Sequence, residues 1–222
     1  MSRLENELLN YESKYTSDGK LKNKLNAKDE VTLNEMERNI TTFKLAKLAL
    51  SDQTIGFDVS YYLSIHKYIF GDIYEFAGEI RSENIAKRIP FCLPQYIYPM
   101  LEDTLKNAKK NVSQITDRDK LLYYVTRLHS DLDIIHPFRE GNGRCERSCI
   151  RQYINHVCKT NNLEPYYLDY LAIKDSDKYI DAVVKADAFM DYNDLYILFD
   201  SVLINKNDKK QALNPNDESK RL

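Results

Sequence analysis

Apolar residues recur at steps of three and four through most of this chain, which is the spacing that one buried face of an α-helix requires. Glycine and proline, the residues that interrupt helices, number only six each among 222 residues. A chain of this length suits one domain with a single core. The pattern therefore predicts an all-α fold with minor sheet content.

The first long helix is expected over 31–50, after the N-cap candidates Asp29 and Thr32. Its apolar stripe is predicted to consist of Leu33, Met36, Ile40, Phe43, Leu45 and Leu48. A second helix is expected to start from the cap Asp58 and to end near Gly71. Further helices are expected at about 95–112, 117–134, 144–160, 174–189 and 191–205, with turn-rich segments between them.

Residues 79–94 interrupt the helical pattern. Short apolar runs alternate here with charged residues between Gly78 and Pro94, and Pro90 lies inside the segment. Proline cannot donate a hydrogen bond to a sheet, so Pro90 favours an edge position. The segment is predicted to form a small β-hairpin flap.

Composition also sets the boundaries of the domain. Residues 1–30 are expected to form a polar N-terminal arm, whose lysines are expected only to solvate it. The helical domain is assigned to 31–205. The polar residues 206–222 are expected to form a frayed, flexible tail.

Charge and cysteine usage exclude several classes of protein. Lys and Arg total 32 against 34 Asp and Glu, a net charge of −2, so neither nucleic acid nor an anionic membrane is an expected partner. No apolar run is long enough to span a bilayer, and the N-terminus lacks a signal-peptide profile. The four cysteines show no CxxC spacing, which favours free thiols. A cytoplasmic protein is expected, and secretion into a host cell stays open.

The segment HPFREGNGR, residues 136–144, joins two predicted helices. Gly141, Asn142 and Gly143 open the second helix, where successive backbone N–H groups and the helix dipole form a site for an anion such as phosphate. Arg144 and Arg147 stand at i,i+3 in its first turns, so both are placed to clamp phosphate oxygens. Arg151 is a weaker third candidate and is more often a surface residue.

Glu140 and His136 add the remaining chemistry to this loop. Glu140 is the one acid in a site otherwise suited to anions, which favours a role as ligand to phosphate-bound Mg²⁺. His136 is the loop's one group able to accept a proton near neutral pH. Phe138 is expected to turn inward and anchor the loop. The set predicts metal-assisted transfer from a nucleoside triphosphate to a protein hydroxyl.

This run resembles the Fic family signature, HxFx[DE]GNGRxxR, at every specified position. These positions are His136, Phe138, Glu140, Gly141, Asn142, Gly143, Arg144 and Arg147. The resemblance implies a Fic-type helical bundle that transfers AMP from ATP to a Tyr, Ser or Thr hydroxyl of a target protein. It assigns His136 as base, Glu140 as Mg²⁺ ligand and the remaining motif residues to the nucleotide and its phosphates, with Arg147 on the γ-phosphate.

The resemblance also assigns roles outside the motif. The flap residues Ile85, Lys87, Ile89 and Phe91 would dock the target by strand addition. Tyr179 precedes a segment that lines the adenine pocket in family members. Related Doc proteins, which act as kinases, carry Lys where this chain has Gly143, so AMP transfer is favoured and a Doc-like kinase is the alternative. A catalytically silent binding module is the other alternative.

Many Fic proteins carry an inhibitory helix with the sequence [ST]xxxE[GN]. The only Ser or Thr with a Glu four residues on is Thr160, paired with Glu164, and Pro165 follows. A residue before proline is disfavoured in a helix, so this is not the inhibitory motif. The chain therefore resembles toxin members whose small antitoxin is a separate chain, which would supply an inhibitory Glu to Arg147.

Other residues receive structural interpretations. Cys145, Cys149, His156 and Cys158 lie on one predicted helix, but His156 is about three turns from Cys145, so a shared zinc site is not expected. Cys145, at a helix N-terminus beside arginines, is predicted to be the most reactive thiol. His66 and His129 are expected to be hydrogen-bonded structural histidines.

Overall fold

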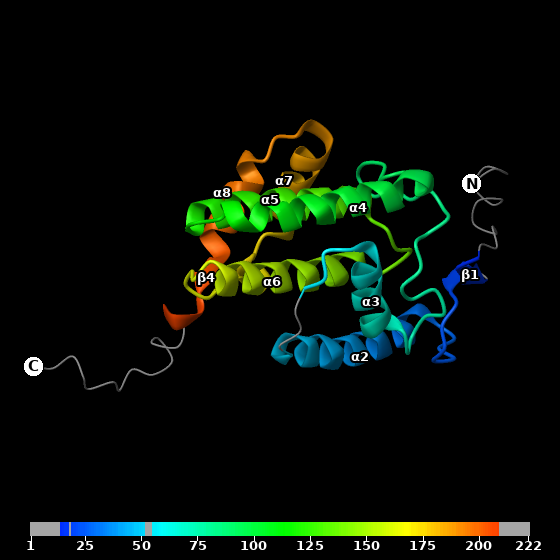
Figure 1. Ribbon diagram of the computed structural model, residues 1–222. Coiled ribbons are helices and arrows are strands. Elements are labelled where there is room, and N and C mark those ends of the chain that lie inside the picture. The colour runs from blue at the N-terminus through cyan, green and yellow to red at the C-terminus, as the bar shows by residue number, and fades with distance from the viewer. Residues whose placement is uncertain (1–13, 18, 52–54, 209–222) are drawn as a thin grey trace, which may run out of the picture.

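The structure is a computed structural model and describes residues 14–17, 19–51 and 55–208 (Figure 1). The predicted all-α fold is confirmed. Its helices are α2 (Glu30–Leu50), α3 (Val59–Phe70), α4 (Pro94–Asn111), α5 (Arg118–Ile135), α6 (Asn142–Thr160), α7 (Ser176–Phe189) and α8 (Asn193–Val202), with short 3₁₀ turns η1 (Val112–Gln114) and η2 (Tyr170–Ala172). Residues 1–13 of the predicted arm and 209–222 of the predicted tail lie outside the described residues.

Capping aspartates set the starts of several helices. The Asp29 side chain accepts a hydrogen bond from the Thr32 amide at 2.8 Å, and Asp58 accepts one from the Tyr61 amide at 2.8 Å. Each bond satisfies one of the N–H groups that a helix start leaves without a partner. Thr32 itself lies inside α2, so its assignment as a cap was wrong.

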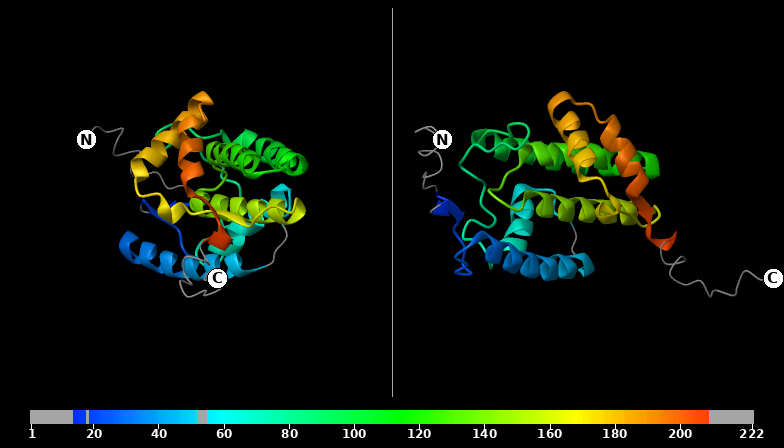
Figure 2. Two further views of the ribbon diagram at one scale, coloured as in Figure 1. Left: turned by 90° about the vertical axis from the view of Figure 1, so that its left-hand side faces the viewer. Right: turned by 180° about the vertical axis from the view of Figure 1, so that it is seen from behind.

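Helix α6 forms the centre of the bundle. Figures 1 and 2 place it between α2 on one side and the layer of α4 and α5 on the other, with α7 and α8 packed against α5. Its core-facing residues are almost completely inaccessible to solvent and include Cys149, Ile150, Ile154 and Val157. The motif ends in the first two turns of this central helix, so the bundle fixes the position of the candidate site.

The sheet content is minor, as predicted. Strand β1 (Thr16–Ser17) pairs antiparallel with β2 (Lys20–Leu21), and β3 (Tyr166–Leu168) pairs antiparallel with β4 (Leu203–Asn205). The helix predicted over 191–205 ends at Val202, because the next three residues pair with β3. That part of the prediction was wrong.

The predicted flap is a hairpin turn with a single isolated bridge between Ala86 and Pro90. The Lys87 amide donates to the Ile89 carbonyl at 3.1 Å, and the Phe91 amide donates to the Ile85 carbonyl at 3.2 Å. The expected pair of strands is absent over residues 79–94. Pro90 has no N–H group, which limits the ladder at this point.

The buried face of α2 differs from the predicted stripe. Leu33 and Leu48 are buried, but Met36 is 37% exposed and Phe43 is 70% exposed. The inward positions between the two leucines belong to Glu37 and Thr41. Helix α2 therefore presents a buried carboxylate toward α6.

Candidate active site

The motif loop begins and ends with left-handed residues. His136, with φ of 43°, ends α5, and Gly141, with φ of 83°, precedes the first residue of α6. A Cβ atom at Gly141 would lie 2.4 Å from the Phe70 ring, so both the dihedral angle and the space require glycine. The loop therefore turns sharply and directs the start of α6 toward a cavity.

The side chain of Asn142 braces this loop. Its Oδ1 atom accepts from the Phe138 amide at 2.8 Å, and its Nδ2 atom donates to the Phe138 carbonyl at 2.8 Å. The structure thus directs the Asn142 amide group into the loop. Its predicted contribution to phosphate orientation stays a prediction.

Phe138 anchors the loop in the core, as expected. Its ring is completely buried and stacks on His66 at 3.7 Å between ring centroids. The side chain therefore lies in the core and not among the groups that face the cavity, which corrects its assignment to the nucleotide-binding set.

His66 fixes the backbone of Glu140. The Gly78 amide donates to His66 Nδ1 at 2.9 Å, so Nε2 carries the proton and donates to the Glu140 carbonyl at 2.8 Å. Burial lowers the pKa of His66 to about 4, and the ring is neutral. The expected structural role of His66 is confirmed.

His136 has one engaged and one open ring nitrogen. A backbone carbonyl can only accept, so Nδ1 donates to the Asp133 carbonyl at 3.1 Å and Nε2 carries the lone pair. Nε2 has no hydrogen-bond partner among the described residues. Burial lowers the pKa of His136, although the Asp133 carboxylate opposes the shift. The ring stacks on Phe91 of the flap at 3.7 Å.

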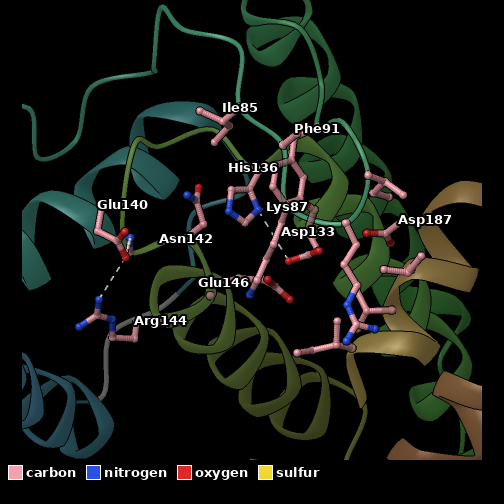
Figure 3. A pocket seen from close by; sticks show the side chains of 18 of the residues that line it. Ile85, Lys87, Phe91, Asp133, His136, Glu140, Asn142, Arg144, Glu146 and Asp187 are labelled. Carbon is pink, nitrogen blue, oxygen red and sulfur yellow. Dashed lines mark hydrogen bonds and ion pairs between the residues drawn. The ribbon is translucent and has the colours of Figure 1, made fainter. Parts of the chain in front are cut away.

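A cavity of about 660 Å³ opens beside His136 (Figure 3). The flap, the motif loop and α7 form its walls. The structure brings to it most residues predicted from sequence, namely Ile85, Lys87, Ile89, Phe91, His136, Glu140, Gly141, Asn142, Gly143, Arg144, Arg147 and Tyr179.

The flap spans this cavity and reaches α7. Arg88 at its tip forms an ion pair with Asp181 and lies 3.7 Å from Asp177. Both acids belong to α7, one turn apart. The sequence interpretation did not foresee this contact, since the partners are distant along the chain.

Arg144 is held by acids on two sides. Its Nη2 atom lies 2.6 Å from Glu37 Oε1 of α2 and 3.6 Å from Glu140 Oε1. In Figure 3 the side chain extends away from His136 and toward α2, and a dashed line joins it to Glu140. The sequence interpretation missed Glu37.

Arg147 lies over the start of α6. A Cβ atom added at Gly143 would lie 2.9 Å from Arg147 Nη1, so the guanidinium folds back across this glycine. Within the described part of the chain, no carboxylate lies within 4.0 Å of Arg147; its guanidinium carbon lies 5.7 Å from the centre of the Tyr170 ring. This cation is therefore available to an external anion.

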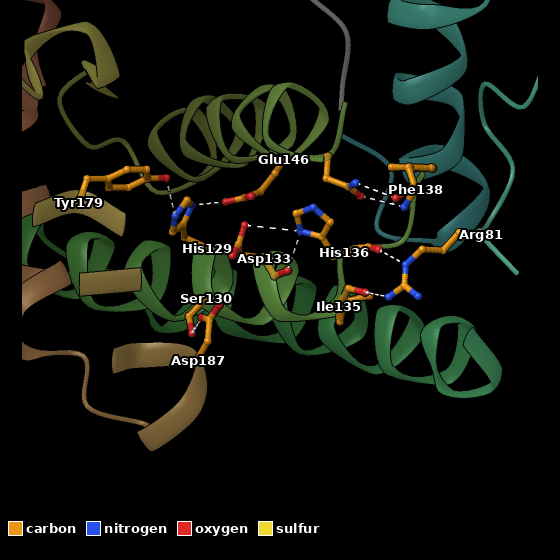
Figure 4. A network of polar contacts seen from close by, with 11 residues as sticks. Arg81, His129, Ser130, Asp133, Ile135, His136, Phe138, Glu146, Tyr179 and Asp187 are labelled. Carbon is orange, nitrogen blue, oxygen red and sulfur yellow. Dashed lines mark hydrogen bonds and ion pairs between the residues drawn. The ribbon is translucent and has the colours of Figure 1, made fainter. Parts of the chain in front are cut away.

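A polar network extends from the cavity lining between α5, α6 and α7 (Figure 4). It includes Tyr179 and His129, which were predicted as a site residue and as a hydrogen-bonded structural histidine, and it adds Glu146, Ser130 and Asp187, which the sequence interpretation missed. The Tyr179 hydroxyl bonds His129 Nε2 at 3.0 Å, and His129 forms a buried ion pair with Glu146. Burial alone would lower the pKa of His129, but the Glu146 carboxylate outweighs it and the pKa is raised. The Ser130 hydroxyl donates to Asp187 at 2.6 Å, and burial raises the pKa of that carboxyl to about 8.

The cysteines do not contribute to the site. Cys145 is completely buried, and burial raises the pKa of its thiol well above the usual range, so its predicted reactivity was wrong. All four cysteines are free. The described residues contain no group of three or more His, Cys, Asp or Glu side chains that could hold a metal ion by themselves.

Glu140 offers a carboxylate that suits a metal ion shared with phosphates. Its Oε1 atom accepts from the Gly141 amide at 2.9 Å, whereas Oε2 has no hydrogen bond or ion pair within the described residues. Mg²⁺ commonly binds one or two carboxylates and completes its shell with phosphate oxygens and water. One open oxygen beside a helix N-terminus fits that requirement once a nucleotide is present.

A family model, described as the Fic/DOC family, matches residues 56–154, which extend from the start of α3 through the motif and most of α6. This chain carries a Fic/DOC family domain. The match includes the flap, His136, Glu140 and both motif arginines.

Curated relatives carry related sequences. The chain is 28% identical over 151 residues to the probable protein adenylyltransferase y4lH of Sinorhizobium fredii, covering 65% of this chain and 77% of that protein. It is 33% identical over 147 residues to the protein adenylyltransferase VbhT of Bartonella schoenbuchensis, covering 60% of this chain and only 28% of VbhT.

Solved structures share the fold of this chain. The Fic domain of a putative cell filamentation protein from Bartonella quintana has a TM-score of 0.74 at 21% identity, covering 90% of this chain and 94% of that one. The BepC protein of Bartonella tribocorum, with bound AMPPNP, has a TM-score of 0.72 at 19% identity, covering 86% and 97%. These similarities concern the fold alone.

None of the helices in the described ranges has the length and apolar character needed to cross a membrane.

Proposed function

We propose that this protein is an adenylyltransferase that moves AMP from ATP to a Tyr, Ser or Thr hydroxyl of a target protein. The observation that carries the proposal is the open Nε2 atom of His136, which faces the same cavity as the N-terminus of α6. Relatives named as protein adenylyltransferases support it.

The proposed chemistry begins at His136. Nε2 accepts the proton of the target hydroxyl as the hydroxyl oxygen attacks the α-phosphorus of ATP. The new oxygen–phosphorus bond forms as the bond to the β-phosphate oxygen breaks, and pyrophosphate leaves. The N–H groups at the start of α6 stabilise the negative charge on the phosphates, helped by the helix dipole.

Glu140 and Arg147 are the proposed phosphate-side groups. Glu140 would hold Mg²⁺ through its open carboxylate oxygen, and the bound ion would neutralise charge on the phosphates. Arg147 has no acidic partner within the described residues and would bind the terminal phosphate with its forked donors. Arg144 would support this arrangement from the α2 side.

The flap is the proposed docking site for the target. Ile85, Lys87, Ile89 and Phe91 line the cavity next to His136, where an extended segment could pair with the flap backbone. Main-chain pairing would place a hydroxyl side chain near Nε2 without requiring one particular target sequence.

A bacterial toxin held inactive by a small antitoxin is the biological role we propose. The lack of an acidic partner for Arg147 among the described residues supports it, because a partner's glutamate would satisfy this cation and displace the terminal phosphate. The test compares purified protein with protein co-expressed with its genomic neighbour. Equal activity of the two preparations would contradict the proposed inhibition by an antitoxin.

We also infer a reducing, cytoplasmic compartment from the free cysteines.

The reaction itself is tested with ATP labelled at the α- or the γ-phosphate, in bacterial lysate with Mg²⁺. Label from the α-phosphate alone, lost in His136→Ala, is expected. Label from the γ-phosphate would instead identify a kinase.

A further inference from the structure

A buried acid outside the motif contacts the candidate active site. Glu37 lies on α2, outside the segment matched by the Fic/DOC family, and is only 7% exposed. Its Oε2 atom accepts a hydrogen bond from the Tyr74 hydroxyl, and its Oε1 atom lies 2.6 Å from Arg144 Nη2. A carboxylate this buried is stable only when charged and hydrogen-bonded partners surround it.

Three further contacts fix the Arg144 guanidinium. Nη1 donates to Thr41 Oγ1 at 3.4 Å, and the guanidinium carbon lies 4.6 Å from the centre of the Phe70 ring. Glu140 Oε1 lies 3.6 Å from Nη2, so the ion pair with Glu37 is much the closer of the two. Helices α2 and α3 therefore determine where this arginine sits, and Glu140 receives only a longer contact.

Because Arg144 pairs closely with Glu37, its contact with Glu140 stays long. In the structure, Oε1 of Glu140 contacts Gly141 and Arg144, and Oε2 has no hydrogen bond or ion pair within the described residues. Without the Glu37 charge, Glu140 would become the nearest acid to Arg144. A guanidinium prefers to bind both oxygens of one carboxylate, so Arg144 would move toward Glu140 and occupy Oε2 as well.

We propose that Glu37 is a positioning residue, which holds Arg144 on the α2 side so that Glu140 keeps one carboxylate oxygen available for nucleotide-bound Mg²⁺. The inference rests on the proposed function of Glu140. It assigns a role in the site to a helix that precedes the family-matched segment. Outer groups that orient metal ligands commonly change metal affinity by about 10- to 100-fold.

The test is calorimetric binding of α,β-methylene-ATP, which does not require AMP transfer. Each variant is titrated with excess Mg²⁺ and again with EDTA, and the ratio of the two dissociation constants gives the Mg²⁺-dependent gain. In Glu37→Gln this gain is expected to fall by about tenfold, while binding in EDTA stays close to that of wild type. Tyr74→Phe, which keeps the charge but removes one hydrogen bond to it, should cause a smaller loss.

Glu35→Gln is the matched control, because Glu35 is exposed on the same helix. Thermal unfolding confirms that each variant is folded. In an E140Q background, Glu37→Gln should cause no further loss of the Mg²⁺-dependent gain. A full gain in folded Glu37→Gln, or an equal loss with Mg²⁺ and EDTA, would overturn the positioning role alone. No gain in wild type would overturn the metal role of Glu140 as well.

Discussion

The buried Arg81 donates from Nε to the carbonyl oxygen of His136 at 2.7 Å. Its other nitrogens reach the carbonyls of Glu83 at 2.6 Å and Ile135 at 3.4 Å, and also that of Cys92. These acceptors belong to both ends of the flap and to the motif loop. One side chain therefore joins the base of the flap to the residue proposed as the general base.

Arg81→Lys should weaken both the fold and the reaction. A lysine keeps the charge but lacks the fork that serves several carbonyls at once, and hydrogen bonds to charged groups contribute about 1.5–3 kcal/mol each. We expect the free energy of unfolding in urea to fall by at least about 2 kcal/mol. AMP transfer measured below the unfolding transition should fall as well. Unchanged stability and activity would contradict the role of Arg81.

The pH dependence of AMP transfer should report His136 and its neighbour. Burial places the pKa of His136 below the ordinary 6.5, so its neutral, proton-accepting form persists to lower pH, and kcat/KM should decline only below 6.5. Asp133→Asn removes a charge that opposes this shift and keeps the backbone carbonyl. In Asp133→Asn the decline of kcat/KM at low pH should therefore move to still lower pH. An unchanged decline would show that the Asp133 carboxylate does not affect the pKa of His136.

Acid should destabilise the fold through His66. The pKa of this ring is about 4 in the folded chain and 6.5 for an ordinary histidine, so the unfolded chain binds more protons between these values and stability falls as pH falls. A shift of this size corresponds to about 3 kcal/mol. His66→Gln should be less stable at neutral pH and should flatten the profile between pH 6.5 and 4. If the free energy of unfolding of that variant fell just as steeply between pH 6.5 and 4, groups other than His66 would be responsible for the loss of stability in acid.

The flap tip should contribute to target binding through Arg88. Its ion pair with Asp181 is partly exposed and therefore worth less than about 1 kcal/mol. We expect Arg88→Ala to raise the KM for the target severalfold, to leave ATP binding unchanged and to reduce the salt dependence of the target KM. Lys178→Ala on the exposed face of α7 is the control. A matching rise in the control would mean that general surface charge, and not the pair, is responsible.

Thiol labelling should separate Cys92 from the other cysteines. Cys92 is half-buried, whereas Cys145, Cys149 and Cys158 are buried. Under native conditions one thiol per chain should react with a soluble disulfide reagent, and Cys92→Ser should abolish that reaction. Burial raises the pKa of Cys92, so even this thiol should react more slowly than free cysteine. Rapid labelling of Cys145 in the folded chain would contradict its position in the core.

Local sequence signals predicted most of the fold. The capping aspartates and the repeated apolar spacing placed the helices to within a few residues, since both signals act within one helical turn. Signals that depend on distant partners failed. Residues 203–205 form a strand only because β3 lies beside them, and nothing within that segment indicates this pairing.

The motif predicted which residues meet at the site, but not which groups hold them. Asp133 and Arg81, which lie outside the signature, contact His136. Glu37, also outside the signature, forms an ion pair with Arg144. Glu37 had a detectable signal, because it shares a helical face with Leu33 and Thr41. The predicted stripe instead ran through Met36 and Phe43, and Glu37 was not singled out. Reactivity at Cys145 was inferred from its place at a helix N-terminus beside arginines, and burial of the thiol outweighs both effects on its pKa.

The most direct test of the proposed function identifies the group that is transferred. Purified wild-type protein and His136→Ala are each incubated with ATP, Mg²⁺ and bacterial lysate, and modified peptides are sequenced by mass spectrometry. The proposed AMP transfer predicts AMP joined to a Tyr, Ser or Thr hydroxyl in the wild-type sample and none with the variant. A phosphate adduct, or AMP adducts of equal abundance with His136→Ala, would contradict it.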